Sequence, residues 1–176
     1  MPAADLLVRE CSEDDAPAVA EIHNQSIATG EATMEEGARD AVDVRQQLAS
    51  LDPRETLLVA EENGAVVGWG LIKKYSPRPG YRFACETAVY VRRDRLGQGI
   101  GSRIKRVLIA RCKELGYHHL VAKILAVNAA SIEYNKKLGY EVVGRQREIG
   151  FKDGRWSDVV IMQLVLDDVT PSPGLM

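Results

Sequence analysis

Three arginines and three glycines lie within ten residues, in the segment RRDRLGQGIG at positions 92–101. Glycine lets the backbone approach a ligand closely, and an apolar pattern of helical period follows directly after it. The first turn of a helix carries partial positive charge, so this segment is suited to hold an anion such as a phosphate ester. A glycine-rich turn beside a solvated basic helix is the purely structural alternative.

Two nucleotide-binding motifs fit the segment poorly. The dinucleotide motif G-x-G-x-x-G lies in the first βα unit and is followed by an acidic residue about twenty positions later. Here Gly97, Gly99 and Gly101 are spaced G-x-G-x-G beyond the middle of the chain, and the residues near position 120 are HLVAK, without an acid. The P-loop needs a Gly-Lys-Ser/Thr ending, which this segment lacks. A dinucleotide-dependent dehydrogenase is therefore disfavoured.

A glutamate and an arginine accompany the β-rich segment FACETAVYV at 83–91. Strand alternation places Glu86 on one face together with Ala84, Ala88 and Tyr90. A lone glutamate flanked by alanines is either an exposed residue or a carboxylate held in a pocket. Arg82, just before the segment, is either a surface arginine or a bidentate partner for a substrate carboxylate.

Strand and helix patterns alternate along the chain and predict an α/β fold, with helices against a mixed sheet. Asn-Gly at 63–64 suits a tight hairpin turn, and Gly116 and Gly139 end two helices. The expected strands cover 6–10, 56–61, 65–74, 83–91, 119–127, 140–150 and 156–166. The expected helices cover 12–28, 42–51, 100–115 and 128–139. In the third helix the basic residues Arg103, Lys105, Arg106 and Lys113 are expected mostly away from the apolar face.

Length and composition indicate one globular domain over residues 1–167, followed by a disordered tail at 168–176. A net charge of −2 gives no support for nucleic-acid binding or for a polybasic membrane patch. The first residues do not form a secretory signal, and no apolar run approaches the length of a membrane span. Three widely spaced cysteines and three histidines without metal-ligand spacing predict reduced thiols in the cytoplasm and no bound metal.

The segment VYVRRDRLGQGIGSRI resembles the R/Q-x-x-G-x-G/A segment of the GNAT superfamily of N-acetyltransferases, and the similarity extends over roughly residues 5–167. The stretch GFKDGRWSD at 150–158 is more specific. Together with IHNQSI…ATMEE at 22–36, it resembles the phosphinothricin and methionine sulfoximine acetyltransferase subfamily. The resemblance implies a central, mostly antiparallel twisted sheet flanked by helices, acetyl-CoA as co-substrate, no metal, and a homodimer. Lys152 and Trp156 either close the pocket or form a dimer contact, although a strand tryptophan is more often a core residue.

The resemblance also assigns roles to residues. Glu86 corresponds to the general base, and Gly80, Tyr81 and Arg82 to substrate-binding residues, with Arg82 holding a carboxylate. Backbone groups of the strand before the glycine loop would bind the pantetheine arm, and the loop amides would bind the pyrophosphate. The implied cofactor-binding residues are Val89, Tyr90, Val91, Gly97, Gln98, Gly99, Ile100, Gly101, Ser102, Asn128 and Lys137.

Position 135 departs from the family. Many members carry tyrosine there, and the subfamily carries histidine, as the acid that protonates the leaving thiolate; this chain has Asn135. Asparagine cannot donate a proton as an acid, so water or Tyr134 replaces it, or the acceptor differs. Because neighbouring helix residues point about 100° apart, we expect that Tyr134 cannot easily take over this role. Met34 also stands where an aromatic residue is common.

The expected activity is acetyl-CoA-dependent acetylation of the α-amine of a small amino acid or analogue, of the phosphinothricin, methionine sulfoximine or methionine sulfone type. One alternative is transfer to another amine, such as a protein N-terminus or a polyamine. A non-catalytic acetyl-CoA-binding module is the other, supported by Asn135 and opposed by the presence of Glu86 and Arg82. No nucleic-acid partner and no membrane contact are expected.

Overall fold

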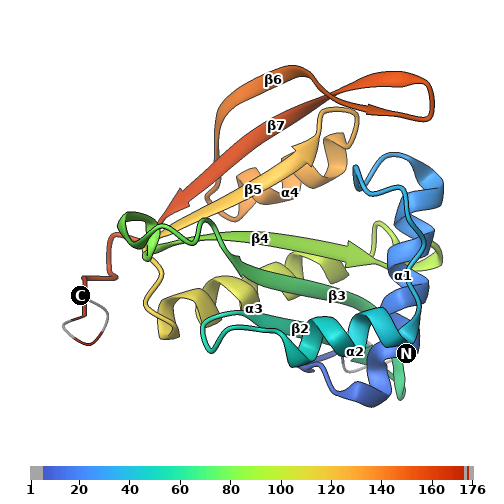
Figure 1. Ribbon diagram of the computed structural model, residues 1–176, viewed down its shortest axis with the longest axis horizontal. Coiled ribbons are helices and arrows are strands. Elements are labelled where there is room, and N and C mark those ends of the chain that lie inside the picture. Colours follow the sequence, from blue (N-terminus) through green and yellow to red (C-terminus); the bar gives the residue numbers. More distant parts are fainter. Residues whose placement is uncertain (1–5, 173, 175–176) are drawn as a thin grey trace.

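The computed structural model describes residues 6–172 and 174. One seven-stranded sheet with the order β1-β2-β3-β4-β5-β7-β6 forms the centre of the molecule (Figure 1). Its strands are β1 (Leu7–Glu10), β2 (Thr56–Glu62), β3 (Ala65–Lys74), β4 (Ala84–Val91), β5 (His119–Leu125), β6 (Glu141–Lys152) and β7 (Arg155–Val165). The helices are α1 (Ala16–Thr29), α2 (Ala41–Ala49), α3 (Ile100–Glu114) and α4 (Ala129–Lys137). The predicted elements are all present, with ends that differ by a few residues.

Helices cover both faces of the sheet because the buried strands alternate their side chains between two cores. In β2, Leu57 and Val59 pack with α1, α2 and Trp69 on one face. Leu58 and Ala60 pack on the other face with the apolar stripe of α3. The hairpin turn predicted at Asn63 and Gly64 is present, with φ angles of 52° and 77°. The mixed, mostly antiparallel fold that the sequence predicts is confirmed.

Strands β4 and β5 are the parallel pair of this sheet, and they separate partway along their length. Their register runs from Ala84↔His119 to Glu86↔Val121, although β4 continues to Val91. Figure 1 shows the two strands diverging from this point, with β5 following β7 and β4 following β3. The side of β4 that faces β5 is therefore without a strand partner beyond Thr87, and this opening positions the candidate site.

Lys105 is an exception to the predicted charge pattern of α3. Its side chain is only 1% exposed, whereas the sequence places it among the solvated basic residues. The reason is helical spacing, because Lys105, Leu108 and Cys112 are separated by three and four residues and share the buried face.

The tail expected to be disordered begins at residue 168. In the structure Lys113 Nζ donates to the Asp168 carboxylate at 2.8 Å, and His118 Nδ1 lies 3.1 Å from the carbonyl oxygen of Val169. Asp168 and Val169 therefore belong to the folded part of the chain. Residues 173, 175 and 176 of this tail lie outside the described residues.

Candidate active site

The glycine loop leads into α3 in a conformation that only glycine adopts readily. Gly97 and Gly99 have φ angles of 75° and 77°, in the left-handed region. Gly99 is the N-cap of α3, and the helical ladder begins where Arg103 N donates to Gly99 O at 3.1 Å. The N–H groups of the three residues between them have no intrahelical acceptor. A helix start of this kind is suited to an anion.

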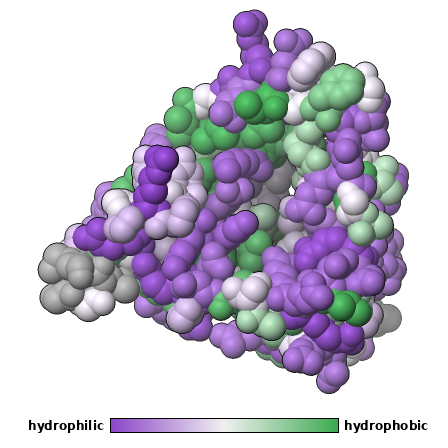
Figure 2. Space-filling view, viewed as in Figure 1, coloured by the Kyte–Doolittle hydropathy of each residue, from purple (hydrophilic) through white to green (hydrophobic). Residues whose placement is uncertain are grey.

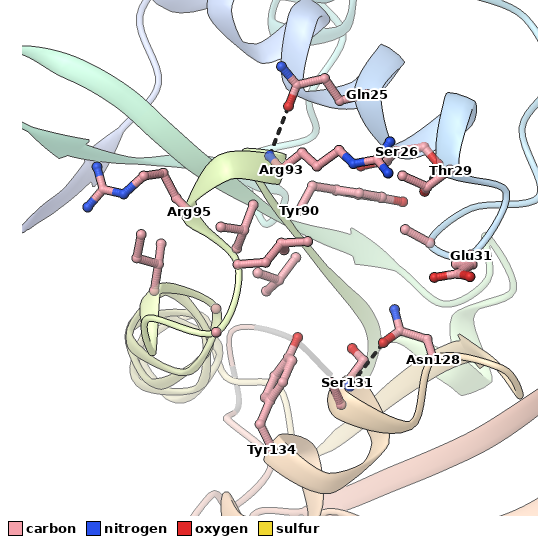
Figure 3. A pocket seen from close by; sticks show the side chains of 18 of the residues that line it. Gln25, Ser26, Thr29, Glu31, Tyr90, Arg93, Arg95, Asn128, Ser131 and Tyr134 are labelled. Atoms are coloured by element: carbon pink, nitrogen blue, oxygen red, sulfur yellow. Dashed lines mark hydrogen bonds between the residues drawn. The ribbon is translucent and has the colours of Figure 1, made fainter.

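A cavity of about 440 Å³ lies beside this helix start. Its walls come from α1, the end of β4, the glycine loop and α4 (Figure 3). Gln25 ties α1 to the loop, since its Oε1 accepts from Arg93 N at 2.9 Å. Asn128 caps α4, since its Oδ1 accepts from Ser131 N at 3.1 Å. In Figure 3 the ring of Tyr134 extends from α4 into the same space.

Most residues predicted to bind the cofactor meet in this cavity. Gln98 and Lys137 are not among its lining residues; Gln98 instead accepts a hydrogen bond from Arg95 Nε at 2.9 Å. The predicted residues that do line the cavity are Val89, Tyr90, Val91, Gly97, Gly99, Ile100, Gly101, Ser102 and Asn128. Those that the sequence did not indicate are mainly on α1 and the following loop, at Gln25, Ser26, Thr29, Glu31 and Ala32. The segment 22–36 resembles the subfamily but has no motif for a phosphate ester, so the fold is what places these residues in the cofactor cavity.

The basic residues of the loop are used in different ways. Arg93 and Arg95 line the cavity, but Arg95 is ion-paired with Glu62. Arg92 is paired with Asp94 at 2.7 Å, and Arg103 donates to the carbonyl oxygen of Leu6 at 2.8 Å. The run of basic residues in the sequence is therefore only partly available to an anion at the helix start.

A second, wider cavity of about 930 Å³ lies beside β5, and Glu86 lines it. Glu86 Oε2 is 2.8 Å from the Nζ of Lys123, which lines the same cavity. Val121 is the parallel partner of Glu86, so Lys123, two residues further along β5, is on the same face. Tyr75, His119 and other residues of the sheet complete this wall, which the sequence alone did not indicate.

The motif at 150–158 contributes to the second cavity through Gly150. A Cβ atom at Gly150 would clash with the terminal methyl group of Met34, so glycine makes room for this side chain. Lys152 is buried and donates to the carbonyl oxygen of Thr33 at 3.1 Å, which fixes the loop after α1. Trp156 is 62% exposed, so its interpretation as a core residue is wrong.

The predicted substrate-binding residues Gly80, Tyr81 and Arg82 precede β4 and are not among the residues that line either cavity. Tyr81 packs edge-on against Tyr75, with ring centroids 5.4 Å apart, and Tyr75 lines the second cavity. Arg82 Nη1 donates to the carbonyl oxygen of Pro79 at 2.9 Å, and its guanidinium carbon lies 5.0 Å from the centroid of the Phe83 ring. Tyr81 therefore contacts a residue that lines the second cavity without lining it itself. The Arg82 guanidinium is bonded to the loop that precedes β4.

A narrow cavity of about 60 Å³ connects the two large ones. It shares Asn128 and Tyr134 with the first cavity and Lys123 with the second. Tyr90 lines all three cavities, and burial raises the pKa of its phenol to about 12. The small cavity, here called the junction, therefore adjoins both larger cavities.

Tyr134 and Asn135 both line the junction. Asn135 is buried and donates from Nδ2 to the carbonyl oxygen of Ser131 at 2.8 Å, while Tyr134 also faces the first cavity. Both positions therefore line the same cavity, although adjacent helix residues point in different directions; that Tyr134 cannot easily take over the role of the acid stays a prediction. Burial raises the pKa of Tyr134.

Within residues 6–172 and 174, no group of three or more histidine, cysteine, aspartate or glutamate side chains is placed to hold a metal ion. The described helices are all too short or too polar to cross a membrane. The free N–H groups at the start of α3, the arginines that line the cavity and the unpaired side of β4 suit a phosphate ester with an extended amide-containing arm, which is the chemistry of coenzyme A.

Fold and site together define an acyl-CoA-dependent acyltransferase, and comparison with known proteins agrees. The family model described as acetyltransferase (GNAT) domain matches residues 8–161. The chain belongs to this family and is an N-acetyltransferase that uses acetyl-CoA.

Two relatives and one solved structure show which members of the family the chain is similar to. The chain is 37% identical over 162 residues to a phosphinothricin N-acetyltransferase of Alcaligenes faecalis, covering 91% of this chain and 82% of the relative. It is 33% identical over 171 residues to an L-methionine sulfoximine/L-methionine sulfone acetyltransferase of Pseudomonas paraeruginosa, covering 94% and 98%. A phosphinothricin acetyltransferase from Sinorhizobium meliloti, solved in complex with acetyl-CoA, superimposes with a TM-score of 0.89 at 30% identity and covers 96% of this chain and 94% of its own.

Proposed function

We propose that this enzyme acetylates the α-amine of a small amino acid or amino-acid analogue, of the phosphinothricin, methionine sulfoximine or methionine sulfone type. The observation that carries the proposal is the ion pair of Glu86 and Lys123 in the wall of the wider cavity. An α-amino acid carries an ammonium and a carboxylate on one carbon. The Glu86 carboxylate is the partner for the ammonium, and the Lys123 ammonium is the partner for the carboxylate. The names of the relatives support the same acceptor class.

Glu86 is the proposed base. The amine of an amino acid is mostly protonated at neutral pH and cannot attack a thioester until it loses a proton. The Glu86 carboxylate lines the acceptor cavity and is two residues from Ala88, which lines the junction. From there it accepts the proton directly or through one water molecule, a role that contributes about 10²–10⁴-fold to the rate of such reactions.

The proposed contacts with acetyl-CoA follow the first cavity. The N–H groups of Ile100, Gly101 and Ser102 bind the pyrophosphate, and Gly97 and Gly99 allow its close approach. The backbone of Val89, Tyr90 and Val91, on the side that β5 leaves unpaired, binds the amides of the pantetheine arm. Asn128 lies at the junction end of this path. When bound, acetyl-CoA supplies the acetyl group as a thioester. Gln98 and Lys137 remain proposals from the family resemblance only.

Arg82 is the family-based candidate for binding the substrate carboxylate, with Gly80 and Tyr81 beside it. This role requires that its guanidinium release the carbonyl oxygen of Pro79. Lys123 already lines the cavity, where its Nζ is held by Glu86. We therefore assign the main carboxylate contact to Lys123 and a secondary one to Arg82.

A panel of acceptors tests the proposed function. The protein is incubated with acetyl-CoA and a thiol reagent, and free thiol is measured with amino acids and their analogues, peptides with a free N-terminus, and polyamines. Faster release with amino acids or their analogues than with the other amines supports the proposal. A preference for peptides or polyamines contradicts it, and acetyl-CoA binding without transfer to any amine indicates a binding module.

A homodimer is the proposed assembly. Apolar side chains are exposed along the hairpin of β6 and β7, and Figure 2 shows hydrophobic residues gathered on this side of the molecule. They include Val142, Val143, Ile149, Phe151 and Trp156. A second copy that covers this hairpin removes the patch from water. Sedimentation equilibrium of the protein and of Trp156→Asp tests this, since the variant is expected to be monomeric.

The proposed compartment is the cytoplasm, where the three free thiols stay reduced.

A further inference from the structure

The junction between the two large cavities has a buried lysine in its wall. Lys105 of α3 lines this cavity together with Tyr134 and Asn135, and its side chain is 1% exposed. On the proposed function, the acetyl group passes from CoA in the first cavity to an amine in the second at this junction. The junction shares lining residues with both cavities. On the proposed function, the sulfur atom that releases the acetyl group is placed at this junction, in whose wall Lys105 lies. This inference rests on the proposed function.

The contacts of Lys105 leave its charge without an anionic partner. Its Nζ donates to Thr87 Oγ1 at 2.6 Å and lies 4.7 Å from the centroid of the Tyr140 ring. Thr87 Oγ1 is in turn 3.1 Å from the hydroxyl oxygen of Tyr140. Among the residues that the structure describes, Lys105 forms no salt bridge with a carboxylate. The titratable or charged groups around it are Cys85, Cys112, Glu86, Tyr140, Tyr134 and Lys123.

A purely structural lysine is a poor explanation for this position. Its neighbours on the same face of α3, Leu108 and Cys112, are buried and apolar, and an apolar side chain at 105 would avoid the loss of hydration that an ammonium suffers. Burial lowers the pKa of Lys105 to about 7. An amine with this pKa exchanges its proton near neutral pH, which is where an acid catalyst works best.

Asn135 and Tyr134 do not supply an equivalent acid. The Asn135 amide has no acidic proton, and its Nδ2 is already bonded to Ser131. Burial raises the pKa of the Tyr134 hydroxyl, so it holds its proton more tightly than a free phenol. Of the groups lining the junction, Lys105 is the one whose acidity burial increases.

We propose that Lys105 is the acid that protonates the leaving sulfur in this enzyme. When the carbon–sulfur bond breaks, its electron pair goes to sulfur, and the Lys105 ammonium transfers one proton to that sulfur, leaving a neutral amine and a thiol. The amine regains a proton from water before the next turnover. Before the proton moves, the ammonium stabilises the negative charge on sulfur.

The ionisation of the thiol of bound CoA tests this role without any acetyl transfer. The ultraviolet absorbance of the thiolate is followed against pH for CoA bound to the unmodified protein and to Lys105→Met. We expect the bound thiol to ionise at a pH lower by about one unit or more in the unmodified protein, because a thiolate beside Lys105 keeps the lysine protonated and the two charges stabilise each other as a coupled pair. Lys113→Met, on the exposed side of the same helix, is the matched control and should behave like the unmodified protein. Equal ionisation in Lys105→Met and the unmodified protein would overturn the proposal.

Two further measurements distinguish a misfolded variant or a general loss of CoA binding from the absence of a role for Lys105. If Lys105→Met does not give a native circular dichroism spectrum, Lys105→Gln, which keeps a donor without a charge, is used in the same titration with the same expectation. CoA that lacks its sulfur should bind the variant and the unmodified protein equally, because the proposed contact is with sulfur. Failure of the unmodified protein to bind CoA contradicts the proposed function itself, and this inference with it. Normal CoA binding with an unshifted thiol overturns only the role of Lys105.

Discussion

Lys123 Nζ lies 2.8 Å from Glu86 Oε2, so the proposed base and a cation share one wall of the acceptor cavity. The two side chains come from strands that part just beyond this point, and both remain partly open to solvent, at 47% and 32% exposure. An exposed pair of this kind adds little to stability. Its position in the cavity wall instead makes both charges available to a bound substrate.

Glu86→Gln should lower kcat by about 10²-fold or more with little change in either KM, because it removes the base and keeps the size of the side chain. The loss should become smaller as the pH is raised, since more of the substrate amine then arrives neutral. Steady-state kinetics across a pH series check this. A loss by the same factor at every pH would mean that Glu86 positions the substrate and does not accept its proton.

Lys123→Met should raise KM for an amino acid by about 10–100-fold, the range expected for loss of a charge-assisted contact with its carboxylate. The affinity for acetyl-CoA should change little. The corresponding amino-acid amide has no carboxylate and should be acetylated equally well by the variant and the unmodified enzyme. Lys136→Met, which removes an exposed lysine on α4, is the control.

Arg82→Ala should raise KM for the same amino acid by less than Lys123→Met does, because the guanidinium lies on its own loop and not in the cavity wall. The two variants are compared with one amino acid under identical conditions. A larger effect at Arg82 would show that the loop before β4 moves onto the substrate and that Arg82, as the family resemblance implies, is the main carboxylate contact.

Gly99→Val should reduce acetyl-CoA affinity strongly. Position 99 has a φ of 77°, which a β-branched residue does not adopt readily, and it precedes the N–H groups proposed to bind the pyrophosphate. Gly37→Val, in a loop where a Cβ meets nothing within 4 Å, is the matched control. Calorimetric titration with acetyl-CoA gives the comparison, and unchanged affinity in Gly99→Val would contradict the assignment of the loop.

Lys105→Met should be more stable than the unmodified protein at pH 6. The folded-state pKa of Lys105, about 7, is below its ordinary value of 10.5, so folding at low pH must bury a charge. As the pH rises above 7 the folded lysine becomes neutral, and the advantage of the variant should shrink by up to about 1.4 kcal/mol per pH unit. Urea unfolding at pH 6 and pH 9 measures this difference. A difference independent of pH would mean that Lys105 keeps an ordinary pKa in the fold.

Local patterns were sufficient to predict the elements and the α/β class of the fold, whereas the mostly antiparallel arrangement was implied by the family resemblance. Alternation in β2 and β3, the Asn-Gly turn and the apolar spacing of α3 each depend on residues close in sequence. The glycine loop was predictable for the same reason, because its chemistry is contained in one short segment.

The acceptor side of the site was not predictable in this way. Glu86 and Lys123 are 37 residues apart in the chain, and only the parallel register of two strands brings them together. Lys105 was assigned to a solvated face because single charged residues on a helix are usually exposed. Its spacing from Leu108 and Cys112 was the available signal, and the apolar character of those two positions outweighed the charge.

The separation of β4 from β5 leaves an unsatisfied strand edge in the middle of the sheet, where most proteins have continuous pairing. Such an edge can be extended by any peptide of suitable shape, including a strand from another molecule. On the proposed function, bound CoA occupies this edge and leaves no room there for a second strand. A ligand that binds only the native state raises its apparent stability by RT ln(1 + [L]/Kd), so added CoA should raise the melting temperature of this enzyme in step with its concentration.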